Sequence, residues 1–187
     1  MQQLRPHSVT LILGGVRSGK SRYAQNLAAR RNSVTFIATA ESREDAEMHL
    51  KVERHRTDRP ATWPTIEEPH HLSAAISTAS QSSDAVLVDC LTIFAANLLE
   101  AHAEDQSALQ AAIDALCKSL QNPLCNILLV SNEVGSGVVP AYASGRRFRD
   151  LVGELNQRIA AVADTVLLIV AGLPLALKGS IPPEVLP

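Results

Sequence analysis

The sequence has no paired cysteines and no long hydrophobic run, and it contains few lysines. Its three cysteines, Cys90, Cys117 and Cys125, form no C-x-x-C pair, which favours buried thiols in a reducing compartment over a disulfide framework. The longest apolar stretch near the C-terminus, 166–173, is far shorter than the roughly 20 residues of a membrane helix. Residues 1–7 contain no apolar core of a secretion signal. We therefore expect a cytoplasmic protein without a membrane span.

Charge is scarce and nearly balanced. Only 19% of the residues are charged, and the net charge is −2, which argues against a protein that coats nucleic acid or binds membranes through a polybasic segment. Four of the 17 basic residues are lysines and the rest are arginines, whose planar guanidinium groups suit phosphate and carboxylate. Six arginines form two clusters: a first arginine cluster of Arg54, Arg56 and Arg59, and a second of Arg146, Arg147 and Arg149.

The 187 residues, 46% of them hydrophobic, predict a single domain with one sizeable core and loose termini at 1–7 and 179–187. Nearly continuous apolar runs predict strands at 8–13, 34–39, 85–89, 126–131 and 165–171. Segments of helical composition lie between them, at 21–31, 45–56, 93–120 and 146–163, with a short helix within 73–83. Strands of this kind are typical of a parallel sheet covered on both faces. We therefore predict a three-layer α/β fold with a mostly parallel central sheet.

Residues 14–21, GGVRSGKS, follow the first predicted strand and match G-x-x-x-x-G-K-[ST], the P-loop pattern, at every fixed position. Its glycines let backbone N–H groups surround phosphate oxygens, Lys20 reaches the β- and γ-phosphates, and the Ser21 hydroxyl ligates Mg²⁺. The alternative is a glycine-rich turn with an incidental lysine. We predict a P-loop NTPase-like fold whose nucleotide site includes Gly14, Gly15, Val16, Arg17, Ser18, Gly19, Lys20 and Ser21.

A P-loop needs an acidic partner for its metal ion, and two strand ends offer one. Asp89 ends the strand at 85–89, and we predict that it holds Mg²⁺ together with Ser21. The alternative for Asp89 is to cap the helix that follows, at 92–99. Glu133, in a polar glycine-rich segment after the strand at 126–131, is a second candidate, with a flexible surface loop as its alternative.

The first arginine cluster surrounds His55, near the predicted end of a helix that Pro60 terminates. Three guanidinium groups around one imidazole would suit a bound polyphosphate, and a neutral imidazole can attack phosphorus to form a phosphoramidate. From the residues alone, however, a surface helix with an incidental histidine is the stronger interpretation. The second arginine cluster is equally compatible with phosphate clamping and with simple surface charge.

Several longer blocks are more specific than the P-loop, which many families share. They include GGVRSGKSRYA at 14–24, ERHRTDRPATW at 53–63, VLVDCLT at 86–92, SNEVGSGVVP at 131–140 and GRRFRDLVGELNQRIAAVAD at 145–164. Through these blocks the chain resembles, over residues 11–178, the bifunctional adenosylcobinamide kinase / adenosylcobinamide-phosphate guanylyltransferase family of cobalamin biosynthesis. The resemblance implies that ATP or GTP phosphorylates adenosylcobinamide, and that GMP then passes from GTP through a histidine to the corrinoid phosphate, giving adenosylcobinamide-GDP.

The resemblance also assigns roles to residues. It implies that His55 is the histidine that receives GMP, in place of the surface interpretation above. It adds nucleotide contacts at Thr39, Ala40, Glu41, Arg56, Thr57, Asp58, Arg59, Glu67 and Asp89. It further implies a homo-oligomer resembling a trimer. The corrinoid-binding residues are not readable, and the loop at 133–140 and the second arginine cluster are our candidates.

Two other functions remain open at this point. One is a P-loop kinase for another small hydroxyl acceptor, in which His55 is structural. The other is a non-catalytic module that a bound nucleotide switches between conformations.

Overall fold

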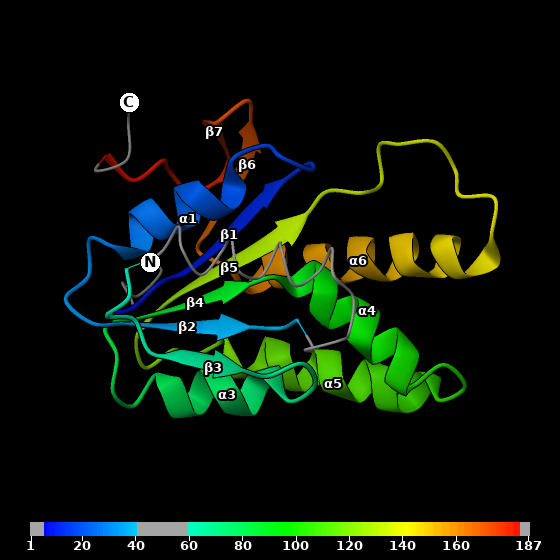
Figure 1. Cartoon of the computed structure of the whole chain (residues 1–187), viewed down its shortest axis with the longest axis horizontal. Helices are drawn as coiled ribbons and strands as arrows, with labels where there is room; N and C mark the ends of the chain where they lie inside the picture. Colours follow the sequence, from blue (N-terminus) through cyan, green and yellow to red (C-terminus); the bar gives the residue numbers. More distant parts are fainter. Residues whose placement is uncertain (1–5, 41–59, 184–187) are drawn as a thin grey trace.

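Within the residues described by the computed structural model, 6–40 and 60–183, a seven-stranded sheet has helices on both faces (Figure 1). The strands are β1 (Val9–Gly14), β2 (Val34–Ala38), β3 (Thr65–Glu67), β4 (Ala85–Asp89), β5 (Asn126–Asn132), β6 (Thr165–Val170) and β7 (Leu173–Lys178). The helices are α1 (Lys20–Ala28), α3 (Leu72–Ala79), α4 (Leu91–Ala101), α5 (Gln106–Ser119) and α6 (Ala143–Val162). The strand order is β3-β2-β4-β5-β1-β6-β7, and only the β6–β7 pair is antiparallel.

The two faces of the sheet have separate apolar cores, as alternation along the strands requires. Ile12 of β1 packs with Leu27 of α1 on one face, whereas Leu11 belongs to the core on the other face, with Phe94 of α4 and Leu155 of α6. Helix α1 therefore covers one face, and α3, α4, α5 and α6 cover the other. The predicted three-layer α/β fold with a mostly parallel sheet is confirmed.

The five predicted strands are all present, with ends within one residue of the expected ones. The region at 93–120 contains two helices, α4 and α5, because residues 102–105 between them are not helical. Asp105 then caps α5, its Oδ1 accepting hydrogen bonds from the backbone N–H groups of Ser107 and Ala108, each at 3.0 Å. The helix predicted at 45–56 lies outside the described residues.

Two strands were not predicted from the sequence. β3 has three residues at the edge of the sheet, and β7 forms the opposite edge. On β7, Leu173, Leu175 and Leu177 are each more than half exposed. Beyond β7, Ile181 packs against the core under α1, so the tail predicted to be loose contacts the core at this residue.

None of the helices in the described ranges has both the length and the apolar character needed to cross a membrane. All three cysteines are free and buried, which confirms the prediction of buried thiols.

Candidate functional site

The candidate site forms where parallel strands end side by side, at the right of the sheet in Figure 1. Gly14 at the end of β1 is paired with Asn132 of β5. Asp89 at the end of β4 is paired with Val130 of β5 and, on its other side, with Ala38 of β2. The P-loop and the predicted acidic residue are therefore separated by one strand, β5, which is about 10 Å for two strand spacings.

The P-loop is closely packed, and two of its glycines are required by geometry. A Cβ atom on Gly14 would lie 2.8 Å from the carbonyl oxygen of Ile169 and would also clash with Ser18. Gly19 has a φ of 94° and precedes the first residue of α1, a left-handed conformation that favours glycine. The backbone N–H of Gly172, in the β6–β7 turn, donates to the carbonyl oxygen of Ser18 at 2.8 Å. The loop is thus held between the strand ends and this turn.

Lys20 is the partly buried cation of the loop, which also carries the exposed Arg17. The Nζ of Lys20 donates to the carbonyl oxygen of Gly15 at 3.1 Å. Burial lowers the pKa of Lys20 from its ordinary value, and the negative charge of Asp89 acts in the opposite direction. The ammonium group therefore lies within electrostatic range of the carboxylate. Ser21, in the first turn of α1, is partly exposed.

Thr39 connects the ends of β2 and β4. It is fully buried, and its hydroxyl donates to the carbonyl oxygen of Cys90 at 2.7 Å and accepts from the N–H of Cys90 at 3.1 Å. Asn97 of α4 donates to the carbonyl oxygen of Thr39 at 2.8 Å. Cys90, rather than Asp89, occupies the N-cap position of α4. Asp89 therefore lies one residue before the N-cap position, and Thr39 helps to fix the strand end that carries Asp89.

Glu67 lies at the same edge of the sheet, far along it from the P-loop. It is exposed at the end of β3, paired with Ala38 of β2. β3 is four strand spacings from β1, about 19 Å, so Glu67 cannot touch phosphates bound in the loop. Its predicted contact with a nucleotide would have to involve the base. Ala40 follows β2 and is partly buried, whereas Glu41, His55, Arg56, Thr57, Asp58 and Arg59 lie outside the described residues.

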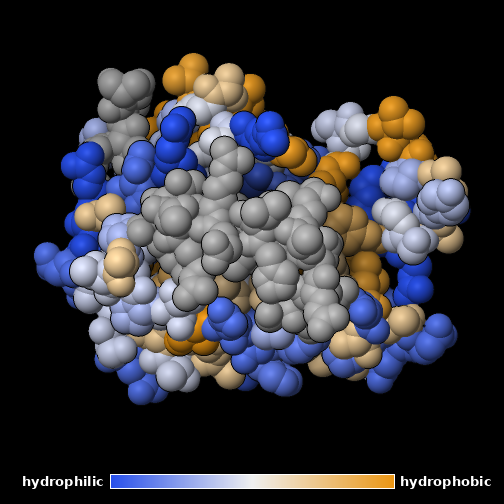
Figure 2. Space-filling view, in the orientation of Figure 1, coloured by the Kyte–Doolittle hydropathy of each residue, from blue (hydrophilic) through white to orange (hydrophobic). Residues whose placement is uncertain are grey.

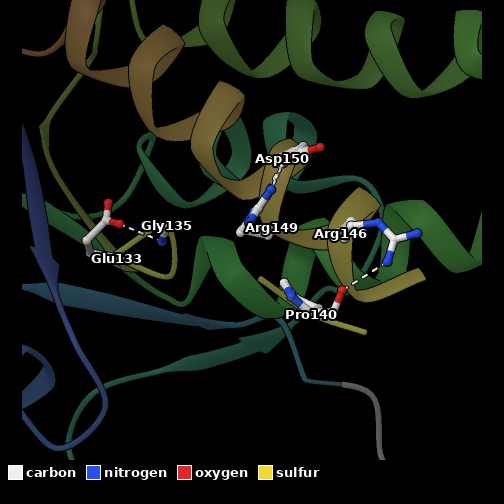
Figure 3. Close-up of polar contacts among 6 residues, drawn as sticks. All are labelled: Glu133, Gly135, Pro140, Arg146, Arg149 and Asp150. Atoms are coloured by element: carbon white, nitrogen blue, oxygen red, sulfur yellow. Dashed lines mark hydrogen bonds and ion pairs between the residues drawn. The ribbon is translucent and has the colours of Figure 1, made fainter. Parts of the chain in front are cut away.

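The backbone of Glu133 is hydrogen-bonded to the first residue of the P-loop. Its N–H donates to the carbonyl oxygen of Gly14 at 3.1 Å. Its carboxylate folds back onto its own loop, where Oε1 accepts from the N–H of Gly135 at 2.6 Å (Figure 3). Glu133 therefore stabilises the turn after β5, and its carboxylate lies apart from Arg146 and Arg149 in Figure 3.

The second arginine cluster is engaged with the protein itself. Arg146 Nη1 donates to the carbonyl oxygens of Pro140, at 2.9 Å, and of Ala141, and Arg149 pairs with Asp150 at 3.1 Å (Figure 3). Arg147 donates to the carbonyl oxygen of Ala103 at 2.8 Å. The Arg146 bonds hold the β5–α6 loop against the start of α6, whereas Arg147 ties α6 to the segment between α4 and α5. Whether the cluster clamps phosphate or only carries surface charge stays a prediction.

One residue of the site was missed by sequence reasoning. Asn132, at the end of β5 beside Gly14, has a buried Oδ1 with no hydrogen-bond partner among the described residues. Its position directly before Glu133 at a predicted strand end was a usable signal. The P-loop and two strand ends thus bring a cation, a carboxylate and a carboxamide to the edge of the sheet where we predict phosphate binding.

The thiol of Cys90, next to Asp89, should be chemically inert. Burial, reinforced by the negative charge of Asp89, raises the pKa of the Cys90 thiol to about 11, so about one thiol in a thousand is ionised at pH 8. We expect N-ethylmaleimide to modify Cys90 at least about 100-fold more slowly in the folded protein than in urea. Peptide mapping by mass spectrometry measures both rates, and equal rates would contradict the burial of this thiol.

Comparison with family models matches residues 10–177 to a family described as cobinamide kinase / cobinamide phosphate guanyltransferase. The chain is 45% identical over 170 residues to the bifunctional adenosylcobalamin biosynthesis protein CobP of Pseudomonas aeruginosa, covering 90% of this chain and 96% of that protein. It is 39% identical over 179 residues to the bifunctional adenosylcobalamin biosynthesis protein CobU of Salmonella typhimurium, covering 90% and 98%.

Solved structures of low sequence identity share the fold. An ATPase from a bacterial type III secretion system superposes with a TM-score of 0.56 at 13% identity, covering 90% of this chain and 56% of that one. A protein of Pyrococcus horikoshii OT3 superposes with a TM-score of 0.57 at 9% identity, covering 97% and 90%. The predicted P-loop NTPase-like fold is confirmed by the ATPase likeness and by the sheet itself.

Proposed function

The chain belongs to the cobinamide kinase / cobinamide phosphate guanyltransferase family, and we propose that it phosphorylates adenosylcobinamide and then transfers GMP to the product, giving adenosylcobinamide-GDP. One observation carries this proposal most directly. The family match over residues 10–177 includes a P-loop that is closed against neighbouring strands, with Lys20 in electrostatic range of Asp89. The site therefore has the groups needed to bind and activate a nucleoside triphosphate.

In the kinase step, the backbone N–H groups of the P-loop and the start of α1 would bind the phosphates of ATP or GTP. Lys20 would exchange the carbonyl oxygen of Gly15 for phosphate oxygens. Ser21 and Asp89 supply a hydroxyl and a carboxylate, the oxygen ligands that Mg²⁺ accepts beside phosphates. A bound Mg²⁺ would neutralise charge that develops on the phosphate oxygens.

In the guanylyl step, an imidazole nitrogen of His55 would attack the α-phosphorus of GTP. The bond to the β-phosphate oxygen breaks and pyrophosphate leaves, so GMP is held as a phosphoramidate. A phosphate oxygen of adenosylcobinamide phosphate would then attack the same phosphorus and release the imidazole. Arg56 and Arg59 would counter the charge of the phosphates during both transfers.

The corrinoid substrate needs an apolar surface next to the phosphate site. The β5–α6 loop exposes Val138 and Val139, 96% and 62% accessible. This loop lies at the upper right of Figure 1, where Figure 2 shows hydrophobic surface. Arg146 holds the far end of this loop. We therefore keep the loop at 133–140 as the candidate contact for the corrinoid. The trimeric assembly and the cytoplasmic location also remain predictions.

Mass spectrometry after incubation with GTP tests the proposal. We expect an added GMP on His55, stable to base and labile to acid, and conversion of adenosylcobinamide to its phosphate and then to its GDP derivative. Corrinoid phosphorylation without any histidine adduct would support the kinase step and contradict the guanylyl step. GTP binding with no corrinoid turnover would favour the nucleotide-switched module.

A further inference from the structure

The carboxamide of Asn132, whose Oδ1 is buried, is a polar group at the described strand ends to which neither the family resemblance nor the mechanism above gives a role. Its strand, β5, lies between β1, which carries the P-loop, and β4, which carries Asp89. Asn132 is paired with Gly14, the first residue of the P-loop. Its Oδ1 is shielded from solvent and has no hydrogen-bond partner among the described residues. A buried acceptor left unpaired costs about 1–3 kcal/mol, so a ligand that donates to it is expected.

Alternation along β5 places the Asn132 side chain on the α1 side of the sheet. Val130 belongs to the core under α1, whereas Ser131 faces α4, with its Oγ 3.5 Å from that of Thr92. Asn132, two residues after Val130, therefore faces the side on which the P-loop leads into α1. Asp89 follows the same rule, because Leu87 also belongs to the core under α1. The carboxamide and the carboxylate thus lie on the same side of the sheet, the side on which the P-loop would bind phosphates.

The backbone of Asn132 is held from both sides, which fixes the direction of its side chain. Its N–H donates to the hydroxyl of Thr92 on α4 at 2.7 Å. Its carbonyl oxygen accepts from Nδ2 of Asn156 on α6 at 3.0 Å. Two helices therefore hold this strand end before any substrate binds, as is required of a group that must orient a reacting atom.

The chemistry of the ligand follows from what the carboxamide offers. Phosphate oxygens are acceptors and cannot satisfy Oδ1, and Lys20, the nearby cation, is needed by the phosphates. Of the two groups that react at a kinase site, the phosphate and the hydroxyl of the phosphoryl acceptor, only the hydroxyl is a donor. A carboxamide accepts through its oxygen and donates through its NH₂ group, so Oδ1 can accept from that hydroxyl while Nδ2 donates to an oxygen of the γ-phosphate.

We propose that Asn132 holds the attacking hydroxyl of the alcohol substrate in line with the γ-phosphate, which deepens the proposed function and rests on its kinase half. In the step itself, a bond forms between the hydroxyl oxygen and the γ-phosphorus. The bond from that phosphorus to the β-phosphate oxygen breaks, and the nucleoside diphosphate leaves with its electrons. The hydroxyl proton passes to an oxygen of the product phosphate, and Asn132 neither gains nor loses a proton.

Asn132→Ala tests this role against the Asn122→Ala control, whose side chain is exposed before the start of β5. We expect kcat for corrinoid phosphorylation to fall about 100-fold, with the nucleotide Kd changed less than about 3-fold and the melting temperature still showing a folded protein. Formation of the GMP adduct has no hydroxyl acceptor, so its rate should stay within about 3-fold of the wild type. A structural defect would lower both reactions.

Asn132→Asp gives a second readout. Its carboxylate has no donor and repels the phosphates, whereas the protonated acid again offers one donor and one acceptor. We therefore expect kinase activity, relative to the wild type at each pH, to rise as the pH falls towards 5. A flat ratio would overturn the proposal, as would phosphorylation by Asn132→Ala within about 3-fold of the wild type.

Failure of the proposed function is a separate outcome, because it is seen in the wild type. If the wild type phosphorylates no corrinoid, the same variants are compared in the slow hydrolysis of GTP and ATP, in which water is the acceptor. The carboxamide should orient that water too, so Asn132→Ala should slow hydrolysis at unchanged nucleotide affinity. Equal hydrolysis rates would then overturn the inference.

Discussion

Lys20→Ala is expected to lower corrinoid phosphorylation by about 1000-fold, the range seen when one charged or hydrogen-bonding group that stabilises a transition state is removed. Lys20 is half-buried, lies within electrostatic range of Asp89 and already reaches across the P-loop to Gly15. The charge that develops on the transferred phosphoryl group would lose the stabilising charge of this lysine. Radiolabelled phosphate transfer from the γ-position of ATP or GTP measures the loss.

The same substitution should leave the fold intact or slightly more stable. Because burial lowers the pKa of Lys20, the folded state binds that proton less tightly than the unfolded chain does. Stability therefore rises as the pH increases from the folded-state pKa to the unfolded one, and the charged side chain weakens the fold below that window. Lys118→Ala, at an exposed position on α5, is the matched control. Equal phosphorylation by both variants would remove Lys20 from the mechanism.

His55→Ala is expected to abolish the GMP adduct while corrinoid phosphorylation stays within about 3-fold of the wild type. The nucleophile forms the covalent bond itself, so no neighbouring group can replace it. The kinase step needs no histidine, because the hydroxyl attacks the γ-phosphorus directly. Incubation with α-labelled GTP and with γ-labelled GTP, in parallel, separates the two activities in one preparation.

The control for this prediction is His102→Ala, at the C-terminal end of α4. It should form the adduct as the wild type does. An adduct of normal yield on His55→Ala would show that another nucleophile accepts GMP. Loss of both activities in His55→Ala would show instead that this histidine supports the fold or binds the nucleotide in both reactions.

The parts of the fold that could be predicted are those with a local signal. β1, β4 and β5 are covered on both faces, so their sequences are nearly continuous in apolar residues. β3 gives no such signal, because two of its three residues are exposed at the sheet edge. β7 alternates proline or alanine with exposed leucines, a pattern that resembles a loose tail as much as a strand.

The candidate site also contains one part with a local sequence signal and other parts without one. The P-loop is one continuous segment with a fixed spacing, so it can be recognised without a structure. Asn132 is significant only because β5 inserts between β1 and β4, an order that no local pattern indicates. The hydrogen bond between Thr39 and Cys90 likewise joins residues 51 positions apart. Such contacts depend on strand order, which is decided by the packing of the whole chain.

The position of β1 in the sheet also decides when the phosphate site can form during synthesis. Ser8, directly before β1, contacts Asn126 across 118 residues, and Val9 contacts Asp164 across 155. The ribosome therefore releases the P-loop strand long before its two neighbours exist. Loops of this length close slowly, and an apolar strand is prone to aggregate until it is paired. Because the two strands that pair with β1 come from the last third of the chain, we expect the yield of folded protein to depend on chaperones and on growth temperature.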